Sequence, residues 1–135
     1  MNDLISQTAT PSGSPTLDPA TVPFFLVQES NFLIAEDIIA SLQSLAPCNT
    51  VHVLCPSEVL SALAGARSVS AIFLEARYVE VLEMKLDSAL TEFGALIILT
   101  AERVDELKAR ALGWGILSRP FTEAMIHREL KAASV

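Results

Sequence analysis

The sequence predicts an α/β fold in which one parallel β-sheet is covered by helices on both faces. Beyond residue 22, five short apolar runs alternate with five stretches whose apolar residues recur at helical spacing. Such alternation is typical of βαβ units, which are joined by right-handed crossovers. The composition agrees, since 51% of the residues are hydrophobic and only 19% are charged, as in folded rather than disordered chains.

The chain of 135 residues has the length of one domain, which we place at residues 23–135. Residues 1–22 contain three prolines and many serines and threonines without periodicity, and they predict a flexible N-terminal lead-in. The predicted strands are the apolar runs Phe24–Val27, Val51–Leu54, Ala71–Leu74, Ala95–Leu99 and Gly115–Leu117.

The predicted helices lie between and after these strands, and local signals mark some of their ends. Ser30 or Asn31 is expected to cap the first helix, and Thr100 and Thr122 the last two. Gly113 is expected to end the fourth helix in a left-handed conformation. The expected apolar faces are Leu33, Ile34, Ile38, Leu42 and Leu45; Val59, Leu60 and Leu63; Val81, Leu82, Leu86 and Leu90; Val104, Leu107 and Ala111; and Met125, Ile126 and Leu130.

Charge and composition exclude several classes of protein. Sixteen acidic residues against nine basic ones give a net charge of −7, which argues against nucleic-acid binding through a basic face. No apolar run is long enough to cross a membrane, and no secretory signal is evident, so we expect a cytoplasmic protein that binds no membrane. The thiols of Cys48 and Cys55 are then expected to be reduced and at least half-buried, and no zinc-binding spacing appears.

Polar side chains follow four of the predicted strands. In parallel sheets, ligands bind at the carboxyl ends of the strands, so these positions are the candidate site. They would bring carboxylate, hydroxyl and guanidinium groups into one crevice. The residues are Gln28, Glu29, Ser30 and Asn31 after the first strand, Glu75 and Arg77 after the third, Thr100 and Glu102 after the fourth, and Ser118, Arg119, Pro120 and Phe121 after the fifth.

From Phe24 to about Ala133 the sequence resembles the receiver domain of bacterial two-component response regulators. The stretches that carry the resemblance are Phe25–Ala35, Ala71–Glu75, Ile98–Glu102 and Gly115–Phe121. The last two are the most specific, with Thr-Ala after a strand and a basic residue before Pro-Phe. The resemblance implies a flavodoxin-like (βα)5 fold, a doubly wound parallel sheet with strand order 2-1-3-4-5.

The resemblance also implies which residues would carry phosphotransfer. In receivers, an acidic pair after the first strand holds Mg²⁺ together with an Asp after the third, and a histidine kinase phosphorylates that Asp. A Thr or Ser after the fourth strand and a Lys before Pro bind the phosphate. Glu29 matches the first acid of the pair, and Thr100 and Pro120 also match.

Four positions depart from the receiver pattern. Ser30 replaces the second acid, Glu75 the phosphoacceptor Asp, Arg119 the Lys, and Ile116 the aromatic residue that reports the switch. One fewer carboxylate weakens the attraction for Mg²⁺, which Glu29 and Glu75 would hold weakly if at all. The longer Glu75 side chain displaces the acceptor carboxylate from its in-line position.

The departures lead to a hypothesis about the state of the crevice. Glu75 could accept hydrogen bonds from Thr100 and a bidentate contact from Arg119, a pair that would permanently replace the phosphorylated state. An inward Arg77 would make the crevice electrically neutral.

These expectations favour a stand-alone, atypical receiver-like module that is not an enzyme and acts through protein contacts. Its partner would be a histidine kinase or another signalling protein. The resemblance implies a contact or homodimer face on the fourth helix, fifth strand and fifth helix. There, basic Arg103, Lys108, Arg110 and Arg128 alternate with acidic Asp105, Glu106, Glu123 and Glu129.

Two alternatives remain. The first keeps phosphotransfer, with Glu75 or a neighbour as acceptor and Mg²⁺ held by Glu29. The second is a small flavodoxin-like nucleotide-binding enzyme, but the five glycines form no phosphate-binding loop. No Ser or Cys is accompanied by a suitably placed His and acid either.

Overall fold

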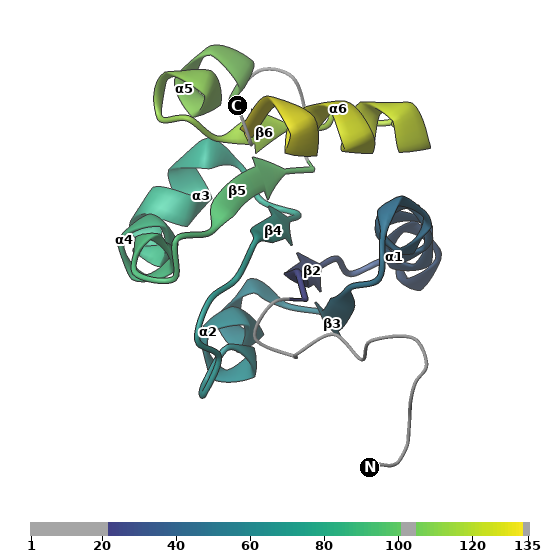
Figure 1. Ribbon diagram of the computed structural model, residues 1–135. Coiled ribbons are helices and arrows are strands. Elements are labelled where there is room, and N and C mark those ends of the chain that lie inside the picture. The colour runs from purple at the N-terminus through teal and green to yellow at the C-terminus, as the bar shows by residue number, and fades with distance from the viewer. Residues whose placement is uncertain (1–21, 101–104, 134–135) are drawn as a thin grey trace, which may run out of the picture.

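The computed structural model describes residues 22–100 and 105–133, with side chains up to Lys131. Five parallel strands form one sheet in the order β3-β2-β4-β5-β6 (Figure 1). This order confirms the predicted α/β doubly wound sheet with strand order 2-1-3-4-5. The strands are β2 (Phe24–Gln28), β3 (Asn49–Val53), β4 (Ala71–Leu74), β5 (Leu96–Leu99) and β6 (Gly115–Ile116), each within two residues of its predicted bounds.

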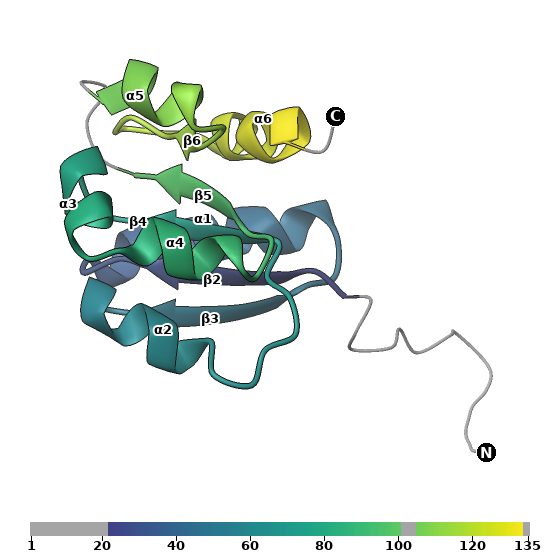
Figure 2. The same ribbon diagram turned by 90° about the vertical axis from the view of Figure 1, so that its left-hand side faces the viewer.

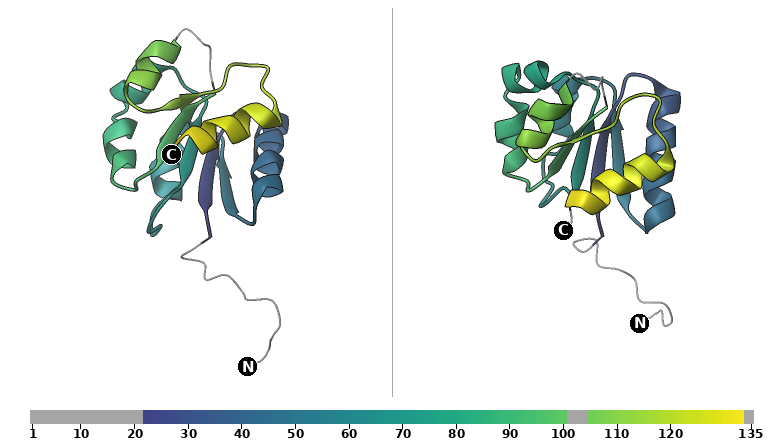
Figure 3. Two further views of the ribbon diagram at one scale, coloured as in Figure 1. Left: turned by 45° about the horizontal axis from the view of Figure 1, so that its top comes forward. Right: turned by 90° about the horizontal axis from the view of Figure 1, so that it is seen from above.

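Helices cover both faces of the sheet (Figures 1 and 3). They are α1 (Phe32–Leu45), α2 (Val59–Ala62) after the 3₁₀ turn η1 (Pro56–Glu58), α3 (Tyr78–Glu83), α4 (Leu86–Thr91), α5 (Glu106–Ala111) and α6 (Glu123–Ala133). Within the described residues, no helix combines the length and apolarity that a membrane crossing requires.

The strands supply apolar side chains to two separate cores, because successive residues of a strand point to opposite faces. Leu26, Ile72 and Leu99 pack with α2, α3 and α4 on one face. Val27 and Phe73 pack with α1 and α6 on the other. The side chains of all five are fully buried, which explains why the strands read as unbroken apolar runs.

The structure decides which of the two candidate residues, Ser30 or Asn31, caps the first helix. The side-chain oxygen Oδ1 of Asn31 accepts hydrogen bonds from the backbone N–H groups of Leu33 (2.9 Å) and Ile34 (3.2 Å). Asn31, rather than Ser30, is therefore the N-cap of α1. Only three residues separate the end of β2 from the start of α1, so this cap orients the loop that carries Glu29 and Ser30.

We expect Asn31→Ala to lower the free energy of unfolding by about 1 kcal/mol, because two N–H groups of α1 lose their acceptor. Asn31→Ser keeps a capping oxygen and should stay within about 0.5 kcal/mol of the native chain. Urea unfolding followed by circular dichroism measures both. Equal losses for Ala and Ser would contradict a capping role.

Several predictions about the helices are wrong. The expected apolar faces include four leucines that are exposed, Leu33, Leu45, Leu60 and Leu82. The N-cap position of α5 is Asp105 rather than Thr100.

Two helices differ further. The third is broken into α3 and α4 at Lys85, whose φ of 57° is left-handed. In one straight helix, Val81 and Leu86 would lie about 140° apart, whereas the break lets both enter the same core. In α5, Leu107 is 87% exposed, and Ala109 faces the sheet instead.

Trp114, which follows α5, packs in the same core as Ala109 of that helix. Its indole is nearly buried and lies 5.6 Å from the Tyr78 ring, centroid to centroid. Gly113, with φ +82°, supplies the predicted left-handed end of α5. The Thr122 hydroxyl accepts the Met125 N–H (3.2 Å) and so caps α6, also as predicted.

Candidate functional site

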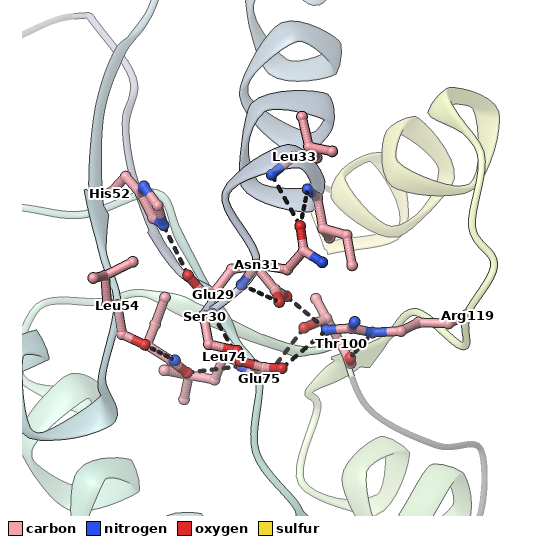
Figure 4. Close-up of polar contacts among 12 residues, drawn as sticks. Glu29, Ser30, Asn31, Leu33, His52, Leu54, Leu74, Glu75, Thr100 and Arg119 are labelled. Atoms are coloured by element: carbon pink, nitrogen blue, oxygen red, sulfur yellow. Dashed lines mark hydrogen bonds and ion pairs between the residues drawn. The ribbon is translucent and has the colours of Figure 1, made fainter.

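The candidate site lies where the carboxyl ends of β2, β4 and β5 meet, at the left-hand edge of the sheet in Figure 2. Glu29, Glu75 and Thr100 each follow directly after one of these strands. Arg119, three residues beyond β6, completes the group, and Figure 4 shows its guanidinium reaching the other residues. The structure thus brings together four of the predicted strand-end residues, Glu29, Glu75, Thr100 and Arg119.

Glu29 is the most buried member of this group. Its side chain is 0% exposed, and each carboxylate oxygen accepts one hydrogen bond. Oε1 accepts from Arg119 Nη2 at 2.6 Å, and Oε2 accepts from the Asn31 N–H at 3.1 Å. The backbone carbonyl of Glu29 accepts from His52 Nε2 at 2.8 Å, so the residue is held at both ends.

Glu75 is more accessible and is held by a different set of donors. Its Oε1 accepts the Ser30 N–H at 2.8 Å, and its Oε2 lies 3.5 Å from Arg119 Nη2. Its side chain is 31% exposed. The predicted hydrogen bond from Thr100 to Glu75 is replaced by another, because the buried Thr100 hydroxyl donates to the Leu74 carbonyl at 3.4 Å.

Arg119 connects the two carboxylates. Its Nε donates to the backbone carbonyl of Thr100 at 3.1 Å, which fixes the plane of the guanidinium over the end of β5. Its Nη2 then faces Glu29 and Glu75 together (Figure 4). The sequence predicted a bidentate pair between Arg119 and Glu75. The structure instead gives the shorter contact to Glu29.

Gln28, which the sequence placed among the strand-end residues without a specific role, is a positioning residue. Its side-chain oxygen accepts the Glu75 N–H (2.9 Å), and its side-chain amide donates to the Leu54 carbonyl (2.9 Å). Gln28 therefore ties the end of β4 to the end of β3 and sets where the Glu75 side chain begins. A polar residue at the last position of an otherwise apolar strand, directly before Glu29, was the signal that could have identified it.

The two carboxyl groups have opposite pKa shifts. Burial raises the pKa of Glu29, and the neighbouring Glu75 charge adds to this, against the opposing effects of the Asn31 N–H and Arg119. Burial also acts to raise the pKa of Glu75, but hydrogen bonds from the backbone and side chain of Ser30, together with Arg119, bring it below its usual value. Glu75 is therefore the more readily ionised of the pair.

The remaining predicted residues lie outside this contact network or contribute differently. Ser30 contributes through its N–H to Glu75. Ile116 is buried in β6. An inward-pointing Arg77 was expected to make the crevice neutral. Its Nε instead donates a hydrogen bond to Asp105 Oδ2 at 2.7 Å. Glu102 and Arg103 lie outside the described residues.

Several charges of the expected contact face are also bound within the chain. Glu129 is buried and accepts two hydrogen bonds from the Arg110 guanidinium, at 2.8 and 3.0 Å. Asp105 is buried as well, and the hydrogen bond from Arg77 holds its pKa below the usual value. These carboxylates are thus less available to a partner than the sequence suggested.

A Mg²⁺ ion does not fit the carboxylate pair as it stands. All four oxygens already face donors: Arg119 twice, and the N–H groups of Asn31 and Ser30. An ion between Glu29 and Glu75 would have to displace the guanidinium. Among the described residues there is also no group of three or more His, Cys, Asp or Glu residues with the geometry to hold a metal ion.

The cysteines do not form a disulfide. Cys48 is half-buried as predicted, whereas Cys55 is exposed, contrary to expectation. Comparison of the sequence with protein-family models and with curated proteins found no match.

Proposed function

We propose that this protein is a receiver-like module of two-component signal transduction that acts through protein contacts, with phosphotransfer weakened or lost. The observation that carries the proposal is the position of Arg119 Nη2, 2.6 Å from Glu29 and 3.5 Å from Glu75. Both carboxylates follow the strands that would supply the ion ligands and the phosphoacceptor of a receiver. A fixed side-chain cation stands where such a domain would need a metal ion.

Electrostatics favour a permanent ion pair over an exchangeable ion. With both carboxylates ionised, the Glu29, Glu75 and Arg119 side chains sum to a formal charge of −1. A phosphoryl donor is itself an anion, so it would approach a crevice that lacks a divalent counter-charge. Binding Mg²⁺ would require Arg119 to leave a carboxylate that is fully buried, which costs far more than breaking an exposed pair.

The way Glu75 is held supports the same proposal. The Ser30 N–H binds Oε1, and the Glu75 backbone N–H is itself bound by Gln28, so both ends of the side chain are fixed. The carboxylate of Glu75 sits one methylene farther from its strand than an Asp carboxylate would. It then carries a negative charge toward Arg119 at all times, as a phosphorylated Asp would do only transiently. The output would therefore be a surface that does not depend on phosphorylation.

One observation favours the alternative of phosphorylation at Glu75. Its carboxylate is 31% exposed, and its pKa is below the usual value, so an ionised nucleophile is accessible from solvent. In this alternative, Glu29 alone would hold Mg²⁺, and Arg119 would move to the phosphoryl group. A stability measurement with a phosphoryl mimic distinguishes the two.

We expect the melting temperature of the native chain to be unchanged by Mg²⁺ with beryllofluoride. A ligand at about 100 times its Kd would stabilise the folded state by about 2.7 kcal/mol, a shift that calorimetry detects readily. The Ser30→Asp/Glu75→Asp/Arg119→Lys variant restores the receiver residues and should show an upshift, whereas Ser30→Asp/Glu75→Asp, which keeps Arg119, should show a smaller one.

An upshift in the native chain would contradict the proposal. So would a gain in mass with acetyl phosphate that hydroxylamine reverses, since this marks an acyl phosphate. Either result would establish the alternative, and the Glu75→Gln variant, which should then lose the mass gain, would locate the acceptor.

A further inference from the structure

The opposite edge of the sheet contains a cavity that plays no part in the proposed signalling function. This cavity is a groove that is partly open to solvent, with a volume of about 570 Å³, and it is lined where the strands begin, including by Phe25 and Leu96. Leu42 of α1 and Leu130 of α6 close it on one side. In Figure 2 this is the right-hand edge of the sheet, toward which the C-terminal ends of α1 and α6 also run.

The size of the cavity matches a small-molecule site. Sites for such ligands usually enclose about 300–1,000 Å³ and are lined mainly by apolar side chains with a few polar groups. The length of β2, five residues at about 3.3 Å each, separates this cavity from the carboxylates by roughly 15 Å. A molecule in the cavity would therefore not contact Glu29, Glu75 or Arg119.

The lining determines which chemistry the cavity accepts. Twelve of the residues that the structure describes line the cavity, and none of these twelve has a charged side chain. The only polar side-chain groups among them are the Cys48 thiol and the Ser70 hydroxyl. A carboxylate or phosphate placed here would lose its hydration without gaining a counter-charge, which makes anions poor ligands. Burial also raises the pKa of the Cys48 thiol, so this group is neutral at physiological pH.

We propose that this cavity is a binding site for an uncharged, largely hydrocarbon small molecule. The Ser70 side chain is exposed and stands at the rim, where it can receive one polar group of the ligand. The exposed Leu45 and the half-buried Leu96 and Leu130 provide apolar surface that the ligand would cover. The driving force is the removal of apolar surface from water on both sides of the contact.

The neutral fluorophore N-phenyl-1-naphthylamine tests the proposal on the full chain. We expect a saturable increase in fluorescence with one site per chain. Ser70→Trp places an indole at the rim and should weaken binding by about tenfold or more. Ser68→Trp is the matched control, since Ser68 is also exposed and lies two residues away but does not line the cavity. The affinity of this variant should be unchanged.

The two cysteines provide a second readout that does not depend on the rim variants. In Cys55→Ser, alkylation by N-ethylmaleimide reports on Cys48 inside the cavity, and the fluorophore should slow it by the fraction of sites occupied. In Cys48→Ser, the reagent reports on the exposed Cys55, which does not line the cavity, and its rate should not change.

Several results would overturn the proposal. One is the absence of saturable binding, and another is equal protection of both thiols. A third is binding that appears only in a Leu4→Ser/Ile5→Ser variant, which would show that the N-terminal segment of the chain itself fills the cavity. Fluorescence that rises only as the chain dimerises would show that a second copy fills it.

Discussion

Arg119→Met is expected to destabilise the protein by about 2–3 kcal/mol at pH 7, the largest effect among the site variants. Removing one member of a buried ion pair usually costs about 3–5 kcal/mol, because the other charge stays buried without compensation. Arg119 is 35% exposed while Glu29 is 0% exposed, so we take a value below that range. Chemical unfolding at pH 7 measures the loss.

The loss should also depend on pH in a defined direction. The pKa of Glu29 is already raised by burial, and without Arg119 it should rise further. A carboxyl group whose pKa is higher in the folded state favours folding below its unfolded pKa, and this contribution disappears as pH rises through the folded value. The difference between native and Arg119→Met chains should therefore be small near pH 4 and widen toward pH 7.

Two further variants separate this ion pair from a general loss of charge. Arg128→Met removes an exposed arginine from α6 and should change stability by no more than about 0.5 kcal/mol. Glu29→Gln/Arg119→Met removes the buried charge as well, and it should regain part of the stability that Arg119→Met loses. A loss that is the same at pH 4 and pH 7 would contradict the role assigned to the pair.

Gly115→Ala is expected to cost about 2–3 kcal/mol, although it adds only one methyl group. A Cβ at residue 115 would lie 2.7 Å from Glu129 Oε1 and 3.2 Å from Ile98 Cγ1. The same Glu129 oxygen accepts hydrogen bonds from Arg110 (2.8 Å) and from the Ile116 N–H (3.2 Å). The carboxylate cannot move aside without breaking these bonds in a buried position.

The matched control is Gly113→Ala, two residues earlier. Residue 113 has open space around its Cβ position but a φ of +82°, so its cost of about 1 kcal/mol comes from backbone conformation alone. In a Glu129→Ala background, Gly115→Ala should cost much less, because the main steric obstacle is gone. Equal costs of Gly115→Ala in both backgrounds would show that the Glu129 carboxylate is not the obstacle.

Much of the fold could be predicted from local patterns in the sequence. Apolar runs of about five residues alternate with helical spacing, and a strand buried on both faces has no polar alternation to obscure it. Strand-end rules also placed Glu29, Glu75 and Thr100 at one edge of the sheet before their geometry was known. These predictions hold because periodicity and chain direction depend only on the order of residues.

The prediction of the buried face from apolar spacing was wrong in the short helix α5. Leu107 was expected to face the core, yet it is 87% exposed, and Ala109 and Trp114 cover the sheet. Arg110 of α5 forms an ion pair with the buried Glu129, a residue 19 positions away in the chain. Such a contact between distant residues cannot be read from the spacing of apolar residues within one short helix.

The order of residues by itself therefore determined the layered α/β architecture and placed Glu29, Glu75 and Thr100 at the carboxyl ends of the strands, whereas the strand order was an implication of the resemblance. Only the tertiary structure decided that Arg119 binds Glu29 more closely than Glu75, that Gln28 positions Glu75, and that an apolar cavity lies at the opposite edge. The physical reason is one of scale. A shift of about 1 Å decides which oxygen a guanidinium reaches, and such shifts depend on how helices and loops distant in the chain pack against one another.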